Sequence, residues 1–293
     1  MFKFYVYKLG QFIVRRLSIK AAYRFAIFFS DIHFFLSFRD RQAVKDNLQI
    51  LFPSETNQKI SVLTREVFRS FGKYLVEFFR MANELDAEFI EKKVRVKNIE
   101  NLEKALARGK GAIILTAHIG NWELGGVILS TLGFPVVAIA LPHKERPVND
   151  LFNKQRQARG MDVVSTHHAI RRCMEILKNN GAVAIVADRD FSASGEVLEF
   201  LGKDVLMPKG AAIFSARAGA AIVPTFLVRE KDDTFSLILE EPLLPPEEIS
   251  REEKIEQAAL VKIIKDYIPV IENKIRQYPS QWLMFRRFWE KNV

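Results

Sequence analysis

The chain has 293 residues, of which 48% are hydrophobic, and this composition excludes an intrinsically disordered protein. Its 44 lysine and arginine residues exceed its 35 acidic residues, so the net charge is +9 and favours an anionic partner: nucleic acid, an acidic carrier protein or a membrane surface. The single cysteine, Cys173, excludes an internal disulfide and fits a reducing compartment, and we expect it to be a small apolar residue within a helix.

The first 38 residues are rich in both basic and aromatic side chains. They contain six lysine or arginine residues and twelve aromatic residues against a single acid, Asp31. The most apolar stretch, residues 21–38, is interrupted by Arg24, Asp31 and His33, whereas a spanning helix needs roughly 20 mostly apolar residues. We therefore predict that residues 1–38 form membrane-associated helices that are interfacial or shallowly inserted rather than spanning. The alternative is a helix pair that packs on the core of the protein itself.

Two other interpretations of this segment are disfavoured. No small-residue cleavage site follows it, so we do not expect a removable signal peptide. Its aromatic residues are mainly phenylalanines in dense apolar runs rather than interleaved along a basic groove, and we therefore expect no nucleic-acid partner.

A helical region follows. Residues 39–51 are expected to form a helix that ends before Pro53, since the residue preceding a proline avoids the helical conformation. A second helix is expected over residues 54–83, where apolar residues recur at near-helical spacing. A short strand at 94–96 and a polar helix from about 99 to 108 complete this part of the chain.

The middle of the chain alternates between strand and helix patterns, as βαβ units do. The expected strands are 111–117, 135–141, 161–165, 182–187, 221–228 and 234–240, and helices at 122–132, 146–159, 169–179 and 208–218 lie between the first five. Right-handed crossovers would give a mainly parallel sheet with helices on both faces. Because only a short charged loop separates the last two strands, we expect that pair to form an antiparallel hairpin.

The carboxy-terminal region is expected to be a surface helix followed by an aromatic and basic tail. Ser250 and Glu253 have the spacing of a capping box, so this polar helix should begin near Arg251 and run to about Arg276.

These patterns together predict an α/β fold with a mainly parallel central sheet flanked by helices. We expect membrane-associated helices in residues 1–38 and a single α/β domain over residues 39–293 that includes the carboxy-terminal helix. No repeat, low-complexity tract or flexible linker interrupts the larger unit.

Residues 115–126 carry the strongest functional signal. A buried-looking strand delivers His118 to a turn, and Glu123 follows at the start of a predicted helix. Residues five apart do not share a helix face, so the two meet only if the chain turns between them, at Gly120-Asn121. A neutral imidazole held by a carboxylate is a general base, and we therefore predict that His118 and Glu123 are catalytic. The alternative is a structural histidine and an ordinary first-turn acid.

A second polar cluster, Asp188-Arg189-Asp190, directly follows the strand at 182–187. In a parallel sheet it would emerge at the same carboxyl edge as His118, where open α/β sheets bind ligands. Arg189 could there bind a phosphate or stabilise a developing oxyanion. The alternative is an arginine–carboxylate pair that holds a loop in place.

Downstream glycines indicate a loop that could approach a ligand closely: Gly195, Gly202 and Gly210. Pro208-Lys209-Gly210 precedes a predicted helix, whose free backbone amides could receive an anionic group.

Other chemistries find little support in the sequence. There is no His-Glu-x-x-His, and His118 has no second histidine four positions on, so we expect no zinc or other metal site. No Gly-x-Ser-x-Gly elbow, Walker-type loop or Gly-x-Gly-x-x-Gly is present, and we expect no nucleotide or other cofactor. The adjacent pair His167-His168 is interpreted as surface polarity.

Four sequence blocks resemble a known family. Residues 118–123, His-Ile-Gly-Asn-Trp-Glu, resemble the H-x-x-x-x-[DE] motif of the lysophospholipid acyltransferase superfamily, in the form typical of bacterial lipid A late acyltransferases that add lauroyl or myristoyl chains. Residues 41–53 resemble the family's amino-terminal block, residues 188–224 its central and later blocks, and residues 281–289 its terminal block. Four blocks in the family's order identify the chain as a member over roughly residues 35–289.

The resemblance implies an O-acyltransferase that moves a fatty acyl chain from a thioester of acyl carrier protein, or of coenzyme A, to a hydroxyl of a lipid A precursor. His118 would deprotonate that hydroxyl, Glu123 would orient His118, and Cys173 would take no part because the transfer is direct. The implied substrate-binding residues are Asn121, Arg189, Asp190 and Gly210. The lipid acceptor would be approached from the cytoplasmic face of the bacterial inner membrane, and an acidic carrier protein fits the positive net charge.

Two features depart from the family pattern. Phe285-Arg286 stands where the family's tail usually has a histidine before its arginine, and the cluster at 188–190 also resembles phosphatidylinositol mannoside acyltransferases. Another membrane glycolipid or a lysophospholipid is therefore an alternative acceptor. Two hypotheses belong to other classes: a non-catalytic membrane- or carrier-binding module, against which the intact His118 and Glu123 argue, and a nucleic-acid-binding protein, whose affinity would fall steeply with salt.

Overall fold

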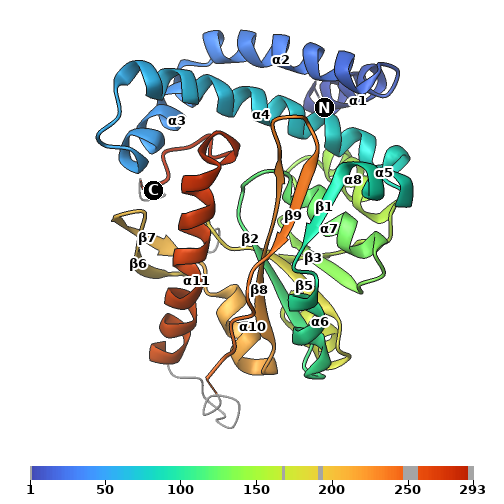
Figure 1. The fold of residues 1–293 in the computed structure, drawn as a ribbon, viewed down its shortest axis with the longest axis vertical. Coiled ribbons are helices and arrows are strands. Elements are labelled where there is room, and N and C mark those ends of the chain that lie inside the picture. The colour runs from blue at the N-terminus through green and yellow to red at the C-terminus, as the bar shows by residue number, and fades with distance from the viewer. Residues whose placement is uncertain (1, 167–168, 191–193, 247–256, 290–293) are drawn as a thin grey trace.

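A computed structural model describes residues 2–166, 169–190, 194–246 and 257–289 (Figure 1). The strands of its central sheet are β1 (Val94–Lys97), β2 (Ala112–Thr116), β3 (Val136–Ala140), β4 (Asp162–Ser165), β5 (Ala182–Val186), β8 (Ala221–Arg229) and β9 (Phe235–Leu239). They lie side by side in the order β1-β9-β8-β2-β5-β3-β4. The strands from β8 to β4 pair in parallel, β9 is antiparallel to β8, and β1 is parallel to β9.

The predicted α/β fold and its mainly parallel sheet are therefore confirmed. Each strand expected in the middle of the chain is present within about one residue of its predicted bounds, as is the short strand near residue 94. The expected hairpin of β8 and β9 is also confirmed, with Phe226 opposite Ile238.

Helices cover both faces of the sheet. One face carries α6 (Glu100–Ala107), α7 (Trp122–Thr131) and α8 (Arg146–Gln157), and the other carries α9 (Ala169–Lys178), α10 (Gly210–Ala218) and α11 (Gln257–Gln277). Successive side chains of a strand point to opposite faces, so Ile113 and Leu115 pack in the core beneath α9 to α11, whereas Ala112 and Ile114 pack beneath α6 to α8. Cys173 of α9 is fully buried in the first of these cores, as expected for an apolar residue.

The helix α4 (Asn57–Glu84) lies between the sheet and the amino-terminal helices α1 (Phe2–Val14) and α2 (Ile19–Leu36) (Figure 1). The helices α2 and α4 approach closely at Gly72, where a Cβ atom would lie 2.2 Å from the Oγ atom of Ser30. Asp31 of α2 accepts hydrogen bonds from the guanidinium groups of Arg65 and Arg69 on α4 at 2.7 to 2.9 Å. The inner sides of α1 and α2 thus pack on the protein itself.

The amino-terminal helices also expose large apolar side chains. At least 38% of the residue surface is exposed for Tyr5, Val6, Leu9 and Phe12 of α1, for Ile19, Phe28, Phe29, Ile32, Phe35 and Leu36 of α2, and for Phe38 at the start of α3 (Phe38–Leu51). Within the described ranges, each helix is too short or too polar to cross a membrane. One side of α1 and α2 therefore packs on the rest of the protein, and the other side exposes large apolar side chains.

The expected loop between Gly195 and Gly210 is instead largely a hairpin of β6 (Glu196–Phe200) and β7 (Lys203–Met207). Its two-residue turn is Leu201-Gly202, and both residues have positive φ, 54° and 81°. This geometry matches the twist of paired strands. The sequence analysis predicted a loop because it relied on the glycines. It missed the hairpin because Leu201, in the first turn position, is not a typical turn residue.

The carboxy-terminal helix α11 ends at Gln277, close to its predicted end, whereas its predicted start and capping box at residues 250–253 lie outside the described residues. The prediction of a surface helix is wrong for one side, since Ile264, Tyr267 and Ile271 are fully buried. Their spacing of three and four residues is that of an amphipathic helix. The sequence analysis also missed α5 (Ala87–Lys93), although Asp86 caps its amino terminus.

The tail after α11 folds back onto α3. The side-chain amide of Asn47 donates to the carbonyl oxygens of Met284 and Arg286 at 3.2 and 2.7 Å, and its oxygen accepts from the backbone N–H of Phe288 at 2.9 Å. Arg287 binds the carboxylate of Asp46 at 2.8 Å. The first and last of the matched sequence blocks are therefore joined in space.

Candidate active site

The strands β2 and β5 are parallel neighbours, so the segments that follow them emerge at the same edge of the sheet. His118 lies in the first segment and Asp188 in the second. Just before them, the N–H of Ala187 donates to the carbonyl oxygen of Thr116 at 2.8 Å, which continues the pairing as far as the site. The cluster at 188–190 therefore meets His118 at the carboxyl edge, as predicted.

Asp188 holds His118 at two points. Its Oδ1 atom lies 2.7 Å from Nδ1 of the imidazole, and its Oδ2 atom accepts from the backbone N–H of His118 at 3.0 Å. The carboxylate is fully buried, whereas 21% of the His118 side chain is exposed. Because an ionised carboxylate only accepts hydrogen bonds, Nδ1 carries a proton, and in the neutral imidazole the free lone pair is then on Nε2. A neutral imidazole in this tautomer has the chemistry of a general base.

The environment of Asp188 favours its ionised form. Burial alone would raise the pKa of this carboxyl group, but the neighbouring His118 and hydrogen bonds from His118 and Trp282 lower the pKa below its usual value. The indole N–H of Trp282 donates to Oδ2 of Asp188 at 3.2 Å.

Glu123 does not make the contact predicted for it. It lies in the first turn of α7, where its two carboxylate oxygens bind Nε and Nη2 of Arg156 on α8 at 2.7 and 2.6 Å. In the described part of the chain, the carboxylate that contacts the His118 ring is Asp188. The orienting contact expected from Glu123 is thus corrected: α7 directs Glu123 toward α8, while the neighbouring strand supplies the partner of His118.

The turn between His118 and α7 is held from several sides. Gly120 has a φ of 62° and packs so tightly that a Cβ atom would lie 1.9 Å from the carbonyl oxygen of Leu227. Its N–H donates to the carbonyl oxygen of Gln281 at 2.9 Å, and the N–H of Leu283 donates to the carbonyl oxygen of His118 at 2.8 Å. The tail therefore runs alongside the turn and fixes it.

Asn121 caps α7, and its side chain is bonded within the protein. Its oxygen accepts from the N–H of Leu124 at 3.0 Å, and its amide group donates to Glu77 of α4 at 2.8 Å. Only 1% of Asn121 is exposed. In this structure Asn121 positions the turn, which differs from the direct substrate contact expected for it.

Two of the other expected ligands, Arg189 and Asp190, directly follow Asp188, and the third, Gly210, begins α10. Arg189 is half-buried, and burial together with the charge of Arg286 lowers its pKa to about 10. Asp190 is 7% exposed, and Gly210 is the first residue of α10, with open space where its Cβ would lie. Within the described residues, no group of three His, Cys, Asp or Glu side chains is placed to hold a metal ion.

Aromatic side chains pack beside His118. The ring of Trp122 meets the imidazole edge to face, with centroids 4.9 Å apart, and Tyr74 of α4 stacks on Trp122 at 4.8 Å. The sequence analysis did not single out Tyr74, and it included Trp282 only as part of the terminal block at 281–289. Their contacts at the site were missed because no spacing along the chain links residues from distant segments.

The fold and site define an α/β protein with a histidine–aspartate pair at the carboxyl edge of its sheet. Comparison with protein families gives a more specific assignment. The model of the bacterial lipid A biosynthesis acyltransferases matches residues 1–291, and the chain belongs to this family. The family resemblance of the four sequence blocks is therefore confirmed.

Individual relatives share 30% sequence identity with this chain in one case and 26% in another. A phosphatidylinositol mannoside acyltransferase of Mycobacterium tuberculosis is 30% identical over 161 residues, which are 53% of this chain and 51% of the relative, so the match spans about half of that protein. The lipid A biosynthesis palmitoleoyltransferase of Escherichia coli is 26% identical over 258 residues, 87% of this chain and 80% of the relative.

Among solved structures, the 1-acyl-sn-glycerophosphate acyltransferase PlsC of Thermotoga maritima aligns with 92% of this chain and 98% of its own. The sequence identity is 14% and the TM-score is 0.38, too remote a likeness to bear on function.

Proposed function

We propose that the protein transfers a fatty acyl chain from an acyl thioester to a hydroxyl group of a lipid A precursor. His118 is the general base and Asp188 is the carboxylate that orients it. The observation that supports this most directly is the 2.7 Å contact between Nδ1 of His118 and the buried carboxylate of Asp188, in a member of a lipid A acyltransferase family.

In the proposed reaction, Nε2 of His118 accepts the proton of the acceptor hydroxyl while the oxygen attacks the thioester carbonyl. The resulting tetrahedral intermediate collapses, the C–S bond breaks, and the departing thiolate takes the proton from the imidazolium. Asp188 balances the positive charge that His118 carries between these steps. No acyl-enzyme is needed, and burial, which raises the pKa of Cys173 to about 11, keeps that thiol out of the reaction.

The remaining site residues have supporting roles in this proposal. Arg189 and the amino terminus of α10 at Gly210 bind the polar head of the acceptor or stabilise the oxyanion, whereas Asp190 binds only the polar head. Glu123 acts through Arg156, because their ion pair fixes the first turn of α7 against α8. We propose acyl carrier protein as the donor, since an acidic carrier suits a net charge of +9, with coenzyme A as the alternative.

The exposed apolar side of α1 and α2 is the proposed membrane contact. Aromatic side chains there include Phe28 and Phe35, 61% and 63% exposed, and lysines and arginines occur along the same two helices. Such a surface enters the headgroup region of an anionic membrane. We propose that the enzyme works at the cytoplasmic face of the bacterial inner membrane, where the lipid acceptor is available.

A second acceptor class is the alternative. The similarity to phosphatidylinositol mannoside acyltransferases favours testing such a glycolipid, together with a lysophospholipid, beside the lipid A precursor.

The test uses the purified full chain with membranes that contain one defined acceptor at a time. Thioesters of acyl carrier protein and of coenzyme A are offered in turn, and mass spectrometry detects the acylated lipid. We expect transfer to the lipid A precursor, loss of transfer in His118→Ala, and retained transfer in Cys173→Ala as the matched control. Transfer by His118→Ala at the wild-type rate would refute the proposed base, and exclusive acylation of a different lipid would refute the acceptor.

A further inference from the structure

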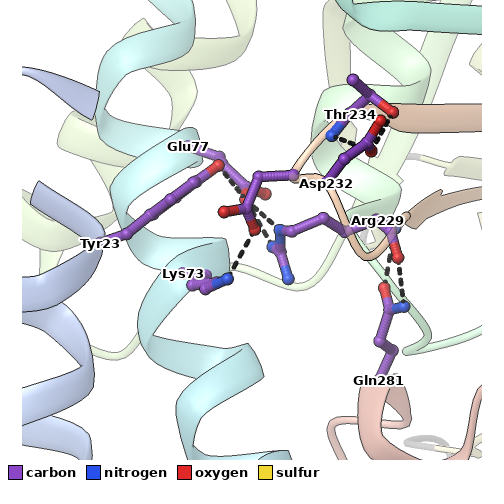
Figure 2. Close-up of polar contacts among 8 residues, drawn as sticks. Tyr23, Lys73, Glu77, Arg229, Asp232, Thr234 and Gln281 are labelled. Atoms are coloured by element: carbon purple, nitrogen blue, oxygen red, sulfur yellow. Dashed lines mark hydrogen bonds and ion pairs between the residues drawn. The ribbon is translucent and has the colours of Figure 1, made fainter. Parts of the chain in front are cut away.

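Glu77 is a buried carboxylate on which three separate elements converge. Its Oε1 atom accepts hydrogen bonds from the hydroxyl of Tyr23 on α2 at 2.8 Å and from Nε of Arg229 at the end of β8 at 2.6 Å. Its Oε2 atom accepts from the side-chain amide of Asn121 at 2.8 Å. The side chains of Glu77 and Arg229 are 4% and 7% exposed. Figure 2 shows Tyr23, Glu77 and Arg229 pointing toward one another.

The backbone of Arg229 is held in place by Gln281. The side-chain amide of Gln281 accepts from the backbone N–H of Arg229 at 2.9 Å and donates to its carbonyl oxygen at 2.8 Å (Figure 2). The backbone carbonyl oxygen of Gln281 in turn accepts from the N–H of Gly120 at 2.9 Å. Glu77 therefore reaches the turn after His118 by two routes, directly through Asn121 and indirectly through Arg229 and Gln281.

The buried ion pair of Glu77 and Arg229 adds little to the stability of the fold, but the fold depends on both partners being present. A buried ion pair gains little stability over apolar packing, but loss of one partner leaves an uncompensated buried charge. None of the atoms that Glu77 binds belongs to His118 or Asp188, so the network acts on the backbone that carries the imidazole.

We propose that Glu77 is a positioning residue for the reaction. Through Asn121 it sets the turn that places His118 against Asp188, and it does so from α4, outside the motif that contains His118. This inference rests on the proposed function for its kinetic test, and on geometry alone for its spectroscopic test.

Two single variants break the direct route. Asn121→Ser keeps a side-chain oxygen that can cap α7 but removes the amide group that donates to Glu77. The serine hydroxyl is bonded directly to Cβ and is therefore too short to replace that donor. Glu77→Gln replaces one accepting oxygen by an NH2 group. In one orientation of the new amide this group faces the side-chain amide N–H of Asn121, and in the other it faces the guanidinium N–H of Arg229. Both should lower kcat by about tenfold to a hundredfold, the order expected for a misplaced reacting group, while KM for the acyl donor stays near the wild-type value.

A double variant tests the hydrogen bond itself. In Glu77→Gln with Asn121→Asp, the amide of residue 77 can donate to the carboxylate of residue 121 while its oxygen still accepts from Arg229. The direction of the bond is reversed, the total charge is kept, and α7 retains a capping oxygen. Asn121→Asp alone places two carboxylates together and should be impaired, whereas the double variant should recover most of the lost kcat.

The control for general destabilisation is Ile60→Val, which opens a small cavity in the first turn of the same helix. It should lower the melting temperature and leave kcat unchanged at a temperature where the protein is folded. The single variants at Glu77 and Asn121 should lower kcat at a temperature where circular dichroism shows them to be fully folded.

A second measurement does not need the substrate. Nuclear magnetic resonance of protein with labelled histidine follows the proton between Nδ1 of His118 and Asp188. We expect this resonance to shift or broaden in Asn121→Ser and to return in the double variant. An inactive wild-type protein with this pattern would refute the proposed function but support the positioning role. Single variants with wild-type kcat and an unchanged resonance, or a stable double variant without recovery in either measurement, would overturn the inference.

Discussion

Trp282 donates its indole N–H to Oδ2 of Asp188 at 3.2 Å, so the carboxy-terminal tail contacts the carboxylate that holds His118. The same oxygen accepts from the backbone N–H of His118 at 3.0 Å. A buried carboxylate needs such donors to remain ionised. The tail is therefore part of the site, although it lies far from β2 in the sequence.

The first prediction concerns Trp282. Trp282→Phe keeps most of the buried ring but removes the donor to Asp188, and a hydrogen bond to a charged group contributes about 1.5 to 3 kcal/mol. We expect a loss of unfolding free energy of that order and a lower kcat, measured by urea unfolding and by acyl transfer. Phe288→Leu, in the same aromatic cluster, is the control for packing alone and should retain the kcat of the wild type.

The second prediction separates Asp188 from Glu123. Asp188→Asn should reduce kcat by about 10³-fold to 10⁴-fold, because the amide no longer fixes the tautomer or balances the imidazolium. Glu123→Gln should have a much smaller effect on kcat, because its carboxylate binds Arg156. Equal losses in purified, folded variants, or a larger loss in Glu123→Gln, would contradict the assignment of the orienting role to Asp188.

The third prediction is a dependence of stability on pH. The pKa of Asp188 lies below its value of about 3.9 in an unfolded chain, so its stabilising contribution is fully present above that pH. The contribution is lost as the pH falls through the lower pKa of the folded protein. The difference in unfolding free energy between the wild type and Asp188→Asn should therefore shrink as the pH falls below about pH 4. A difference that persists unchanged at lower pH would refute this linkage.

The fourth prediction concerns the ion pair of Glu123 and Arg156, whose side chains are 11% and 8% exposed. Arg156→Met leaves a carboxylate buried without its partner and should cost about 3 to 5 kcal/mol of unfolding free energy. Combining it with Glu123→Leu removes both charges and should recover most of that loss. Chemical denaturation of the single and double variants checks this, and additive losses would show that the two side chains act independently.

The fifth prediction concerns the exposed side of the amino-terminal helices. Replacing Phe28, Phe35 and Phe38 with serine should weaken binding to anionic vesicles, because each phenyl ring that enters the acyl boundary contributes on the order of 1 kcal/mol. Co-sedimentation with vesicles measures the loss. Val197→Ser removes an equally exposed apolar side chain on β6 and should bind vesicles like the wild type. Unchanged binding by the triple variant would exclude this side as the membrane contact.

Local patterns predicted the sheet well because its strands are nearly continuous apolar runs bounded by turn residues, as strands buried on both faces are. The hairpin of β6 and β7 was missed because its strands expose charged residues, and its leucine at positive φ gives no signal.

The candidate site was predicted in part for the same reason. The position of His118 at the edge of the sheet follows from β2 alone, and the proximity of Asp188 follows from two parallel strands. The partner of the imidazole depends on side-chain direction, and the sequence analysis chose Glu123 because it is near in the chain and matches the family motif. Glu77 lies on a helix whose apolar periodicity dominates its pattern, so a buried carboxylate there resembled an ordinary surface acid.

The hydroxyl of Tyr23 has a consequence for handling the protein. Because it belongs to α2 and binds a carboxylate inside the molecule, the first two helices do not behave as a removable membrane tether. Removing these helices would take the Tyr23 hydroxyl donor away from Glu77 and expose apolar side chains along α4, including Phe68 and Phe79. Detergent or lipid that shields the outer side of these helices is thus a better route to a well-behaved sample than truncation.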